Sequence, residues 1–490
     1  MKYIATFDIG TTAIKGILVT QDLKIIHAES IELTTLFTER HKEQDPQQWY
    51  DSFCTIAKQF TKLVNPAEIM GIVMSGQMQN LILLRKDGYP LQNAILYSDA
   101  RATSQVESLN TILGDGTVQR ITGNPFDASI PFAKLLWLKE NMPDMLEKTH
   151  KIVISSKDTV IARLCGEFVT DVTTASTSGL MDIESRTWRA DWLEMIGVSS
   201  GLLPRLCVAH EEVGSVLNVA SAETGFEVGT AVYAGVGDAG AATLAGCVSK
   251  PGEYNINLGT SGWVATMSQN TQKQEGVFNL VAISADCLIN VVPFFNAGNV
   301  HKWICSILAP DDRQTEKYEY GNTLLNAGTC GSHGLFCLPY FVGERFPVVD
   351  EAIKGAYIGI TPETTKQDII RATLEGVAFA IRQGIESLSY TPVSISLIGG
   401  GAKVNVWCQL LSEVLATPLD VYPDTEIAPS LAIATSVLIT KNIIKGYDEF
   451  INLRKSNCVS YTPVQQNVEH YQRAYEEYLR IYPAIKTLYR

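Results

Sequence analysis

The chain has 490 residues, of which 46% are hydrophobic and 19% are charged, and its formal net charge is −13. This composition is typical of a soluble globular protein rather than a disordered one, and the length predicts two or three domains. The negative charge argues against a nucleic-acid or anionic-membrane partner, because binding to phosphate backbones needs clustered Lys and Arg, but it leaves a nucleotide ligand open.

Ten cysteines are scattered along the chain without a C-x-x-C pair, and the few histidines show no metal-binding spacing. The cysteine pattern predicts reduced, mostly buried thiols. The first residues read as a strand rather than as a signal peptide, and no run reaches the roughly 20 apolar residues of a membrane span. We therefore expect a cytoplasmic protein.

The first thirty residues predict an antiparallel meander. Apolar and polar residues alternate over 3–8, 15–20 and 24–30, as they do in half-buried strands. Asp45 and Pro46 then predict the N-cap and first turn of a helix whose apolar residues recur at three- and four-residue steps.

A similar opening recurs in the second half of the chain. Asp8-Ile9-Gly10-Thr11-Thr12 and Asn257-Leu258-Gly259-Thr260-Ser261 match in character, and each follows a predicted strand and precedes another. Two such openings, each at the head of a half-chain, predict two related domains that face one another. We expect an N-terminal domain over 1–247 and a C-terminal domain over 248–490, with a helical tail from about residue 446.

Later elements are also predicted from local signals. Thr361-Pro362-Glu363 predicts the start of a long helix. Residues 394–398 predict a β-branched strand, which the turn Gly399-Gly400-Gly401-Ala402 connects to a helix over 406–416.

The two Gly-Thr turns carry the groups that bind phosphate. Glycine lets the backbone approach an anion closely, exposed N–H groups point at it, and Thr or Ser hydroxyls donate further hydrogen bonds. Gly10-Thr11-Thr12 alone is more often a plain hairpin turn. The second copy, Gly259-Thr260-Ser261, shifts the balance toward phosphate binding, because one polyphosphate can be bound from both domains.

Three further candidates accompany these turns. Asp8 ends a strand, where it is suited to hold Mg²⁺ through water. Lys15 lies on the returning strand and either reaches phosphate or is only a solvated strand residue. The glycines at 399–401 precede a helix N-terminus, which favours negative charge, although tight strand–helix packing explains them equally well.

Asp238 lies among glycines in Gly235-Val236-Gly237-Asp238-Ala239-Gly240, after an apolar strand at 230–234. A carboxylate at such a strand end can accept the proton of an attacking hydroxyl. The local alternative is an N-cap of a helix that begins at Ala239, and the residues by themselves favour the cap.

Two polar loops contain groups suited to a polyol, because hydroxyls pair with planar polar groups while C–H faces pack on rings. One loop follows a strand at 69–74 and the other a strand at 94–96. The alternative is a pair of structural loops in which Asp99 pairs with Arg101. The candidate ligands are Gln77, Met78, Gln79, Tyr97 and Asp99.

Nine segments together resemble the FGGY family of carbohydrate kinases over about residues 3–445. The block at 355–380 is the most specific. The resemblance implies an α/β fold with two ribonuclease H-like, actin-like ATPase domains around a deep cleft. The segments are DIGTTAIK (8–15), EQDPQQWY (43–50), SGQM (75–78), SDARA (98–102), GVGDAG (235–240), NLGTSG (257–262), LPYFVGER (338–345), GAYIGITPETTKQDIIRATLEGVAFA (355–380) and GGGAKVNVW (399–407).

The resemblance also implies ATP and Mg²⁺ as cofactors and a small sugar as substrate. It implies that Asp238 is the catalytic base and Asp8 the Mg²⁺-linked aspartate. Sugar binding belongs mostly to the N-terminal domain and ATP binding to the C-terminal one, and dimerisation is common in such kinases. The implied ATP-binding residues are Gly10, Thr11, Thr12 and Lys15, then Gly259, Thr260 and Ser261, and in the adenosine segment Gly400, Gly401, Ala402 and Asn405.

Within the family the nearest pattern is that of the xylulokinases, with departures in the sugar site. Gln79-Asn80 replaces His-Gly, Tyr97 stands where Trp is usual, and Ala239 replaces Asn. KLLWLKENMP (134–143) and STSGLMDIESRTW (176–188) resemble gluconate kinases equally well.

The sequence therefore predicts transfer of the ATP γ-phosphate to a terminal hydroxyl, with D-xylulose first among the substrates. Gluconate, ribulose and a pentitol are the alternatives. A non-catalytic actin-like or sugar-sensing protein is the alternative of another class, against which the presence of Asp8 and Asp238 argues.

Overall fold

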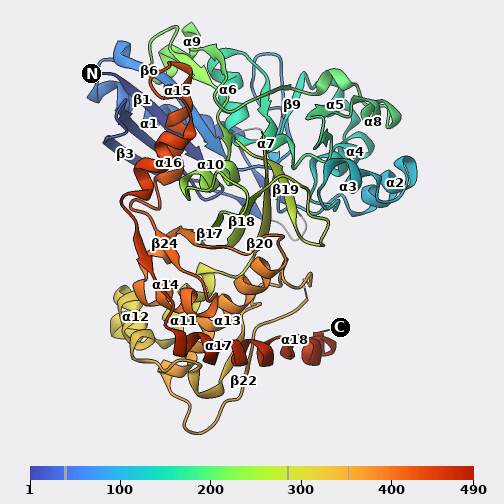
Figure 1. The fold of residues 1–490 in the computed structure, drawn as a ribbon. Helices are drawn as coiled ribbons and strands as arrows, with labels where there is room; N and C mark the ends of the chain where they lie inside the picture. Colours follow the sequence, from blue (N-terminus) through green and yellow to red (C-terminus); the bar gives the residue numbers. More distant parts are fainter. Residues whose placement is uncertain (38–40, 284–285, 351, 490) are drawn as a thin grey trace. The chain divides into compact units, whose positions relative to one another are not determined.

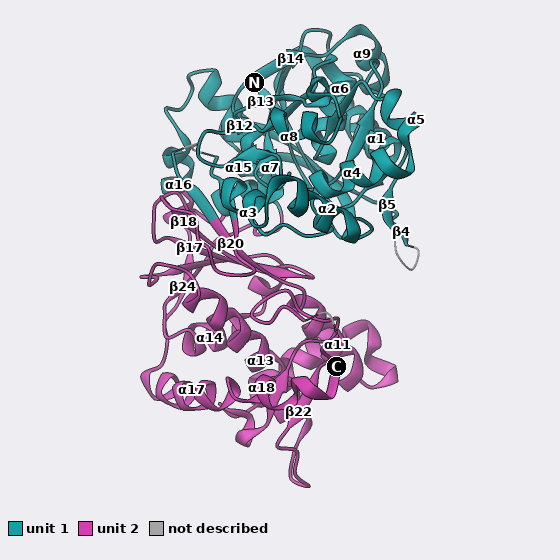
Figure 2. Ribbon diagram, turned by 90° about the vertical axis from the view of Figure 1, so that its right-hand side faces the viewer, with its two compact units in different colours: residues 1–245, 279–289, 427–452 teal, residues 246–278, 290–426, 453–490 magenta. Residues whose placement is uncertain are grey.

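The computed structural model describes residues 1–37, 41–283, 286–350 and 352–489 (Figure 1). The chain forms two compact units, each assembled from three segments (Figure 2). Unit 1 comprises Met1–Ala245, Asn279–Ile289 and Ile427–Asn452, and unit 2 comprises Gly246–Phe278, Asn290–Glu426 and Leu453–Arg490. Both are mixed α/β, which confirms the predicted class. The predicted division into an N-terminal domain over 1–247 and a C-terminal domain over 248–490 stays a prediction.

The main sheet of unit 1 has the strand order β14-β15-β6-β1-β2-β3, with β16 also paired to β6. The antiparallel pairs β1–β2 and β2–β3 confirm the meander, while β1, β15 and β16 run parallel to β6. The strands span Tyr3–Ile9 (β1), Ala13–Thr20 (β2), Ile25–Glu32 (β3), Ile69–Gly76 (β6), Glu212–Ser215 (β14), Ala231–Tyr233 (β15) and Val236–Gly237 (β16).

Helix α1 (Pro46–Leu63), which the apolar periodicity predicted, packs on the meander strands β1, β2 and β3. Asp45 is its N-cap and accepts a hydrogen bond from the Gln47 N–H at 2.9 Å. Phe53 and Phe60 of this helix lie in the core against Phe7 of β1, with ring centroids 4.2 and 5.5 Å away. Aromatic burial of this kind is a large part of the free energy that holds a helix on a sheet.

A helix from late in the chain belongs to the same unit. α15 (Ala428–Thr440) packs against β6 and β1, and its Val437 approaches Gly71 of β6. Almost every residue of α15 is buried, as expected of a helix that is apolar on all sides.

Small sheets and short helices complete unit 1. The small sheets are β4 (Leu36–Phe37), β5 (Lys42–Gln44) and β8 (Ala94–Ile95); β7 (Ile82–Leu84) and β9 (Lys151–Val153); β10 (Val169–Asp171) and β13 (Arg205–Cys207); β11 (Met181–Asp182) and β12 (Thr187–Trp188). The helices are α2 (Thr103–Leu113), α3 (Thr117–Thr122), α4 (Pro131–Asn141), α5 (Pro143–Glu147), α6 (Ser156–Cys165), α7 (Val172–Ala175), α8 (Ala190–Met195), α9 (Asn218–Thr224) and α10 (Asp238–Ala245).

The second main sheet has the order β19-β20-β18-β17-β23-β24-β25. β17 pairs antiparallel with β18 and parallel with β23, which confirms the predicted second opening and the strand before the glycine turn. The chain passes between the units within β20 and between Phe278 and Asn279 of β19. The strands span Phe278–Val281 (β19), Leu288–Phe294 (β20), Gly262–Ser268 (β18), Tyr254–Leu258 (β17), Ile395–Ile398 (β23), Leu419–Val421 (β24) and Val459–Tyr461 (β25).

The predicted start of the long helix was wrong. α13 spans Lys366–Glu386 and begins after Thr365, whose hydroxyl oxygen accepts from the Asp368 N–H while the Asp368 carboxylate accepts from the Thr365 N–H. This capping box satisfies two amides at the helix start and outweighs the proline signal at Pro362. Residues 361–364 form a turn instead, closed by the Thr364 N–H and the Thr361 carbonyl.

The remaining helices of unit 2 include the predicted C-terminal ones. Tyr471 and Tyr475 of α17 donate to Glu375 and Glu386 of α13 at 2.7 and 2.6 Å. The helices and one hairpin are α11 (Gly298–Leu308), α12 (Lys317–Ala327), α14 (Asn405–Val414), α17 (Gln465–Tyr478), α18 (Ile481–Ile485), and β21 (Phe336–Leu338) with β22 (Ala356–Ile358); α16 (Tyr447–Lys455) begins in unit 1 and ends in unit 2.

All ten cysteines are free, and seven of them are buried, as predicted. Among the described helices, none combines the length and the apolar character that a membrane crossing requires.

Candidate active site

Asp8 and Asp238 lie at the same edge of the unit 1 sheet. β1 and β16 flank β6 in parallel, and both Asp8 and Val236 are in register with Ser75. Asp238 follows β16 directly as the first residue of α10. The Ser75 hydroxyl donates to the Asp8 carboxylate at 2.7 Å. The parallel pairing thus brings together two carboxylates that are far apart in sequence.

Glycines allow β16 and the residue before it to approach β6 closely. Gly235 has a φ of +63°, and a Cβ on it would lie 1.8 Å from the Met74 carbonyl oxygen. A Cβ on Gly237 would lie 2.3 Å from the Met78 sulfur. Neither position has room for a side chain, so packing requires glycine on both sides of Val236, just before Asp238.

Asp238 does not take the N-cap place that its sequence offered as the local alternative, because α10 begins at Asp238 itself and not at Ala239. One carboxylate oxygen accepts from the Ala239 N–H at 2.8 Å, whereas an N-cap side chain accepts from an N–H two or three residues further along. The Asp238 side chain is only partly buried. Burial, the nearby Asp8 and then Asp171 raise the pKa of Asp238 to about 7, although the Ala239 N–H acts in the opposite direction.

Asp8 is electrostatically coupled to the same edge. Burial raises the pKa of Asp8, although the Ser75 hydroxyl and the Lys15 ammonium both favour its charged form. Lys15 lies directly opposite Asp8 in the register of β1 and β2, so the structure brings this predicted residue to the site. Of these two groups, Asp238 has the pKa of about 7, which is suited to general-base catalysis at neutral pH.

The turn between β1 and β2 presents N–H groups. The carbonyls of Thr11 and Thr12 accept from the Gln44 side chain at 2.6 Å and the Leu33 N–H at 2.9 Å. Among the described residues, none accepts a hydrogen bond from the N–H of Thr11 or Thr12. Such a turn, with its carbonyls bonded and its amides free, is suited to an anion.

The two threonine hydroxyls of this turn differ. Thr11 donates its hydroxyl proton to the Gln77 side-chain oxygen at 3.1 Å, whereas Thr12 is exposed. The arrangement favours Thr12 as the hydroxyl donor to a ligand and Thr11 as the anchor of the turn.

The predicted sugar-binding residues divide into two groups. Gln77 and Asp99 are buried, and their polar atoms are bonded within the protein. Asp99 accepts two hydrogen bonds from the Arg101 guanidinium, at 2.9 and 2.7 Å, and one each from the N–H groups of Arg101 and Lys42. Although burial acts to raise the pKa of Asp99, the Arg101 guanidinium lowers it below its ordinary value. These contacts favour a positioning role for both residues.

Met78, Gln79 and Tyr97 form the second group. Met78 lies against Gly237, next to Asp238. Gln79 has a left-handed backbone, with a φ of +63°, and its Nε2 donates to the Ser129 hydroxyl at 2.8 Å. The Tyr97 N–H donates to the Asn80 side chain at 3.0 Å, which joins the two polar loops. Two of the departures from the family pattern, Asn80 and Tyr97, are therefore in direct contact.

Sequence reasoning missed Gln44, Ser75 and Ser129. Gln44 and Ser75 lie within or beside segments that carried the family resemblance, but their partners Thr11 and Asp8 are 33 and 67 residues away. Only tertiary structure shows these contacts. Ser129 follows no motif in the chain.

In unit 2, the turn Gly259–Ser261 connects β17 to β18, and Thr260 and Ser261 are exposed. The carbonyls of Gly259 and Thr260 accept from the N–H groups of Gly298 and Asn299 in the first turn of α11, both at 2.9 Å. A Cβ on Gly298 would lie 2.3 Å from the Gly259 oxygen, so this contact requires glycine.

The predicted adenosine segment lies at the same edge of this sheet, because β23 runs parallel to β17 and ends beside Asn257. Gly399, with a φ of +92°, and Gly401 pack against Leu258, where a Cβ would be 2.6 and 2.8 Å from the nearest atoms. A Cβ on Gly400 would meet nothing within 4 Å. Asn405 accepts from the Tyr461 hydroxyl at 2.8 Å.

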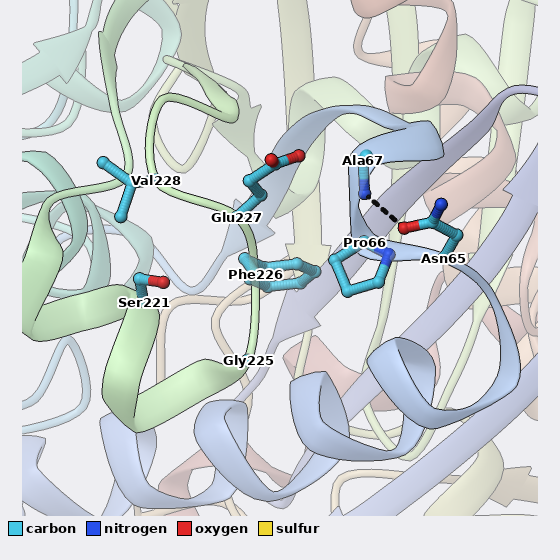
Figure 3. Close-up of a pocket in the computed structure, with 8 residues that line it drawn as sticks. All are labelled: Asn65, Pro66, Ala67, Ser221, Gly225, Phe226, Glu227 and Val228. Atoms are coloured by element: carbon cyan, nitrogen blue, oxygen red, sulfur yellow. Dashed lines mark hydrogen bonds between the residues drawn. The ribbon is translucent and has the colours of Figure 1, made fainter.

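A hollow of about 500 Å³ on unit 1 lies elsewhere (Figure 3). It includes Pro66 and Ala67, just before the start of β6, whereas Asp8 and Ser75 are at the far ends of their strands. Six strand residues span about 20 Å, so the hollow does not belong to the carboxylate site. Its lining residues are Asn65, Pro66, Ala67, Ser221, Gly225, Phe226, Glu227 and Val228.

The donor set at the carboxylate edge fits Mg²⁺. The described residues contain no group of three or more His, Cys, Asp or Glu side chains placed to hold a metal. Mg²⁺ in nucleotide sites commonly takes one or two carboxylates and keeps several waters. Asp8 offers one such carboxylate at this edge, and the remaining positions around the ion would be taken by water and phosphate.

Two family models account for most of the chain. Residues 3–245 match the N-terminal domain of the FGGY family of carbohydrate kinases, and residues 254–430 match its C-terminal domain. The chain therefore belongs to the FGGY family, and it is a sugar kinase with the actin-like ATPase fold of that family.

The individual relatives include kinases named for two different substrates, xylulose and gluconate. The xylulose kinase of Bacillus subtilis (strain 168) is 30% identical over 499 aligned residues, covering 100% of this chain and 98% of the relative. The ligand-bound xylulose kinase from Lactobacillus acidophilus superimposes with a TM-score of 0.90 at 24% identity, over 100% of this chain and 99% of the other. The gluconate kinase from the same organism has a TM-score of 0.90 at 25% identity, with the same coverage.

Proposed function

We propose that this sugar kinase transfers the γ-phosphate of ATP to the terminal hydroxyl of D-xylulose and forms D-xylulose 5-phosphate. The substrate is supported by the full-length similarity to a xylulose kinase at 30% identity. The chemistry is supported by one observation above all, the placement of Asp238 and Asp8 at one edge of the sheet, where burial and the Asp8 carboxylate raise the pKa of Asp238 to about 7.

In the proposed reaction, ionised Asp238 accepts the proton of the sugar hydroxyl as its oxygen attacks the γ-phosphorus. The bond between that phosphorus and the oxygen bridging to the β-phosphate breaks, and ADP leaves. Catalysis of this kind depends mainly on in-line positioning and charge stabilisation. Mg²⁺, when bound, supplies positive charge to the β- and γ-phosphates, and Asp8 would hold it through water.

ATP contacts are assigned to both units. In unit 1 the free N–H groups of Thr11 and Thr12, the Thr12 hydroxyl, Gly10 and Lys15 are the proposed phosphate contacts. In unit 2 the proposed contacts are Gly259, Thr260 and Ser261 for phosphate and Gly400, Gly401, Ala402 and Asn405 for adenosine.

The surroundings of Gln79 favour a neutral sugar over gluconate. Ser129 accepts from Gln79 and donates to the exposed carboxylate of Asp127. A sugar acid bound beside Gln79 would place its carboxylate near this negative charge, and like charges repel at short range. Gluconate remains the second candidate because a gluconate kinase is equally similar in fold.

A coupled ADP-release assay over xylulose, ribulose, gluconate, glycerol and the pentitols tests the substrate. We expect the highest kcat/KM for D-xylulose and a 5-phosphate product in the phosphorus NMR spectrum. A higher kcat/KM for gluconate would replace the proposed substrate with the second candidate.

The departures in the sugar site are tested by substitution. If Gln79 and Ala239 set specificity, Gln79→His combined with Ala239→Asn raises the preference for D-xylulose over the other sugars of the panel. Unchanged kcat/KM ratios would show that these two positions do not determine the sugar.

A further inference from the structure

Gln44, the last residue of β5, is fully buried and uses its whole side-chain amide. Its Nε2 donates to the Thr11 carbonyl at 2.6 Å and to the Thr35 hydroxyl at 2.8 Å. Its Oε1 accepts from Gln77 at 2.8 Å and from the Trp49 indole at 3.1 Å. These four bonds join the turn after β1 to a buried aromatic residue of α1.

Gln77 continues this network on the other side of the turn. It is also buried, and its backbone N–H donates to the Ile9 carbonyl at 3.0 Å. Its side-chain oxygen accepts from the Thr11 hydroxyl at 3.1 Å. The two glutamines therefore hold both the backbone and the side chain of Thr11.

The first residues of β5 hold the other loop. The Lys42 N–H donates to the Asp99 carboxylate at 2.7 Å, and Glu43 accepts from Arg101 at 2.7 Å. Arg101 is also bonded to Asp99, so the loop after β8 is fixed by an ion-pair cluster. Lys42 and Gln44 are two strand residues apart, a spacing of about 7 Å.

We propose that β5 sets the spacing between the sugar-side loop at 97–101 and the phosphate-side turn at 10–12, and that Gln44 is a positioning residue for phosphoryl transfer. The inference rests on the proposed phosphate-binding role of this turn. Gln44 touches neither substrate; it acts through the Thr11 carbonyl. Because transfer requires in-line approach, displacing the turn by about 1 Å is expected to lower the rate by about 10²-fold.

The test is Gln44→Met, which keeps the length and volume of the side chain and removes all four hydrogen bonds. We expect kcat for sugar phosphorylation to fall by 10- to 100-fold, with the sugar KM within about threefold of the parent. The ratio of sugar-independent ATP hydrolysis to sugar phosphorylation should rise, because a water molecule is less constrained in position than a bound sugar.

Gln48→Met is the matched control. Gln48 lies four residues along the chain, and its amide oxygen accepts from the Thr34 N–H at 3.0 Å, next to the Thr35 partner of Gln44. It makes no bond to the turn at 10–12. Both kcat and the hydrolysis ratio should stay within twofold of the parent.

Two results would overturn the inference. One is a Gln44→Met enzyme with parental kcat and an unchanged hydrolysis ratio. The other is an equal loss of hydrolysis and phosphorylation together with a lowered Tm, which would indicate only a structural amide. If Gln44→Met does not fold, Gln77→Met undergoes the same measurements, and the same two results would overturn the inference.

Thr12→Val separates this inference from the proposed function. If Thr12→Val raises the KM for ATP while Gln44→Met behaves as the parent, the turn binds phosphate and the positioning role of Gln44 is wrong. If neither variant changes any kinetic constant, the assignment of the turn to phosphate is itself wrong.

Discussion

The two Gly-Thr turns occupy matching places in the two main sheets but are built differently. Each follows the first strand of an antiparallel pair, and each of these first strands has a parallel neighbour, β6 or β23. In unit 1 the Thr11 carbonyl is held by a side chain, that of Gln44. In unit 2 both turn carbonyls are held by main-chain N–H groups of α11.

The first residue of each motif differs as well, with Asp8 in unit 1 and Asn257 in unit 2. The unit 1 edge carries two carboxylates with raised pKa values: burial raises the pKa of Asp8, and burial together with Asp8 raises the pKa of Asp238 to about 7. The unit 2 turn and glycine segment offer amides and hydroxyls from Asn257 to Ser261 and from Gly399 to Ala402. Under the proposed function, the same hairpin would serve reaction chemistry in unit 1 and nucleotide binding in unit 2.

The strongest test of this division is Asp238→Asn. Loss of the base is expected to lower kcat by about 10³-fold, because general-base catalysis contributes about 10²- to 10⁴-fold. The Kd for ATP, measured by calorimetry, should change by less than twofold. Retention of a tenth of the parental turnover would refute the assignment of the base.

The carboxylate of Asp8 and the amide of Asn257 can each be replaced by the side chain of the other motif. Asp8→Asn should lower Mg²⁺-dependent turnover by about 10²-fold, in the range found when groups that support a metal are lost. Sugar binding, measured by calorimetry without nucleotide, should not change. A weakened sugar affinity would contradict the Mg²⁺-linked role of Asp8.

The reverse exchange, Asn257→Asp, places a negative charge beside the unit 2 turn. We expect the KM for ATP to rise by about tenfold, since a like charge at short range costs roughly one pKa unit or more of interaction. The sugar KM serves as the internal control and should stay constant. An unchanged KM for ATP would show that phosphate does not bind near this turn.

Gly298→Ala breaks the main-chain contact of unit 2. Its Cβ would lie 2.3 Å from the Gly259 oxygen, so the turn or the start of α11 must shift. We expect a rise of about fivefold in the KM for ATP, smaller than the effect of displacing reacting groups directly. Gly446→Ala, where a Cβ meets nothing within 4 Å, is the control and should be neutral.

The pH dependence gives the smallest expected effect, a shift in Tm. Because the pKa of Asp238 in the folded protein lies above its ordinary value, folding favours the protonated form, and the stability contribution of this group falls as pH rises from about 4 to about 7. Asp238→Asn should therefore melt at a higher Tm than the parent at pH 8 and show no such gain at pH 4. A lower Tm at pH 8 would contradict the raised pKa.

Local signals were sufficient for some of the strands and for both Gly-Thr turns. Period-two alternation predicted β1, β2 and β3, and the glycines marked both hairpins and the segment after β23. Asp8 and Asp238 became candidates because each is predicted at a strand end, and the parallel pairing of β1 and β16 with β6 places them at one edge of the sheet.

Two kinds of feature were not predicted from the sequence: those where two local signals compete, and those where the partners lie far apart along the chain. At the start of α13 a proline signal competed with the capping box of Thr365 and Asp368, and the box prevailed. Gln44 lies in a three-residue strand too short for any periodic signal. Its partners Thr11 and Gln77 are each 33 residues away, so their contact arises only when the unit is folded.

The placement of α15 has a consequence for synthesis on the ribosome. All strands of the unit 1 main sheet have been translated by Gly237, but the helix that packs on β6 and β1 is translated only at Ala428–Thr440. Until then the nascent chain carries an uncovered apolar sheet face, which is a surface that chaperones bind and that drives aggregation. A fragment that ends at Ala245 would have the same uncovered face permanently.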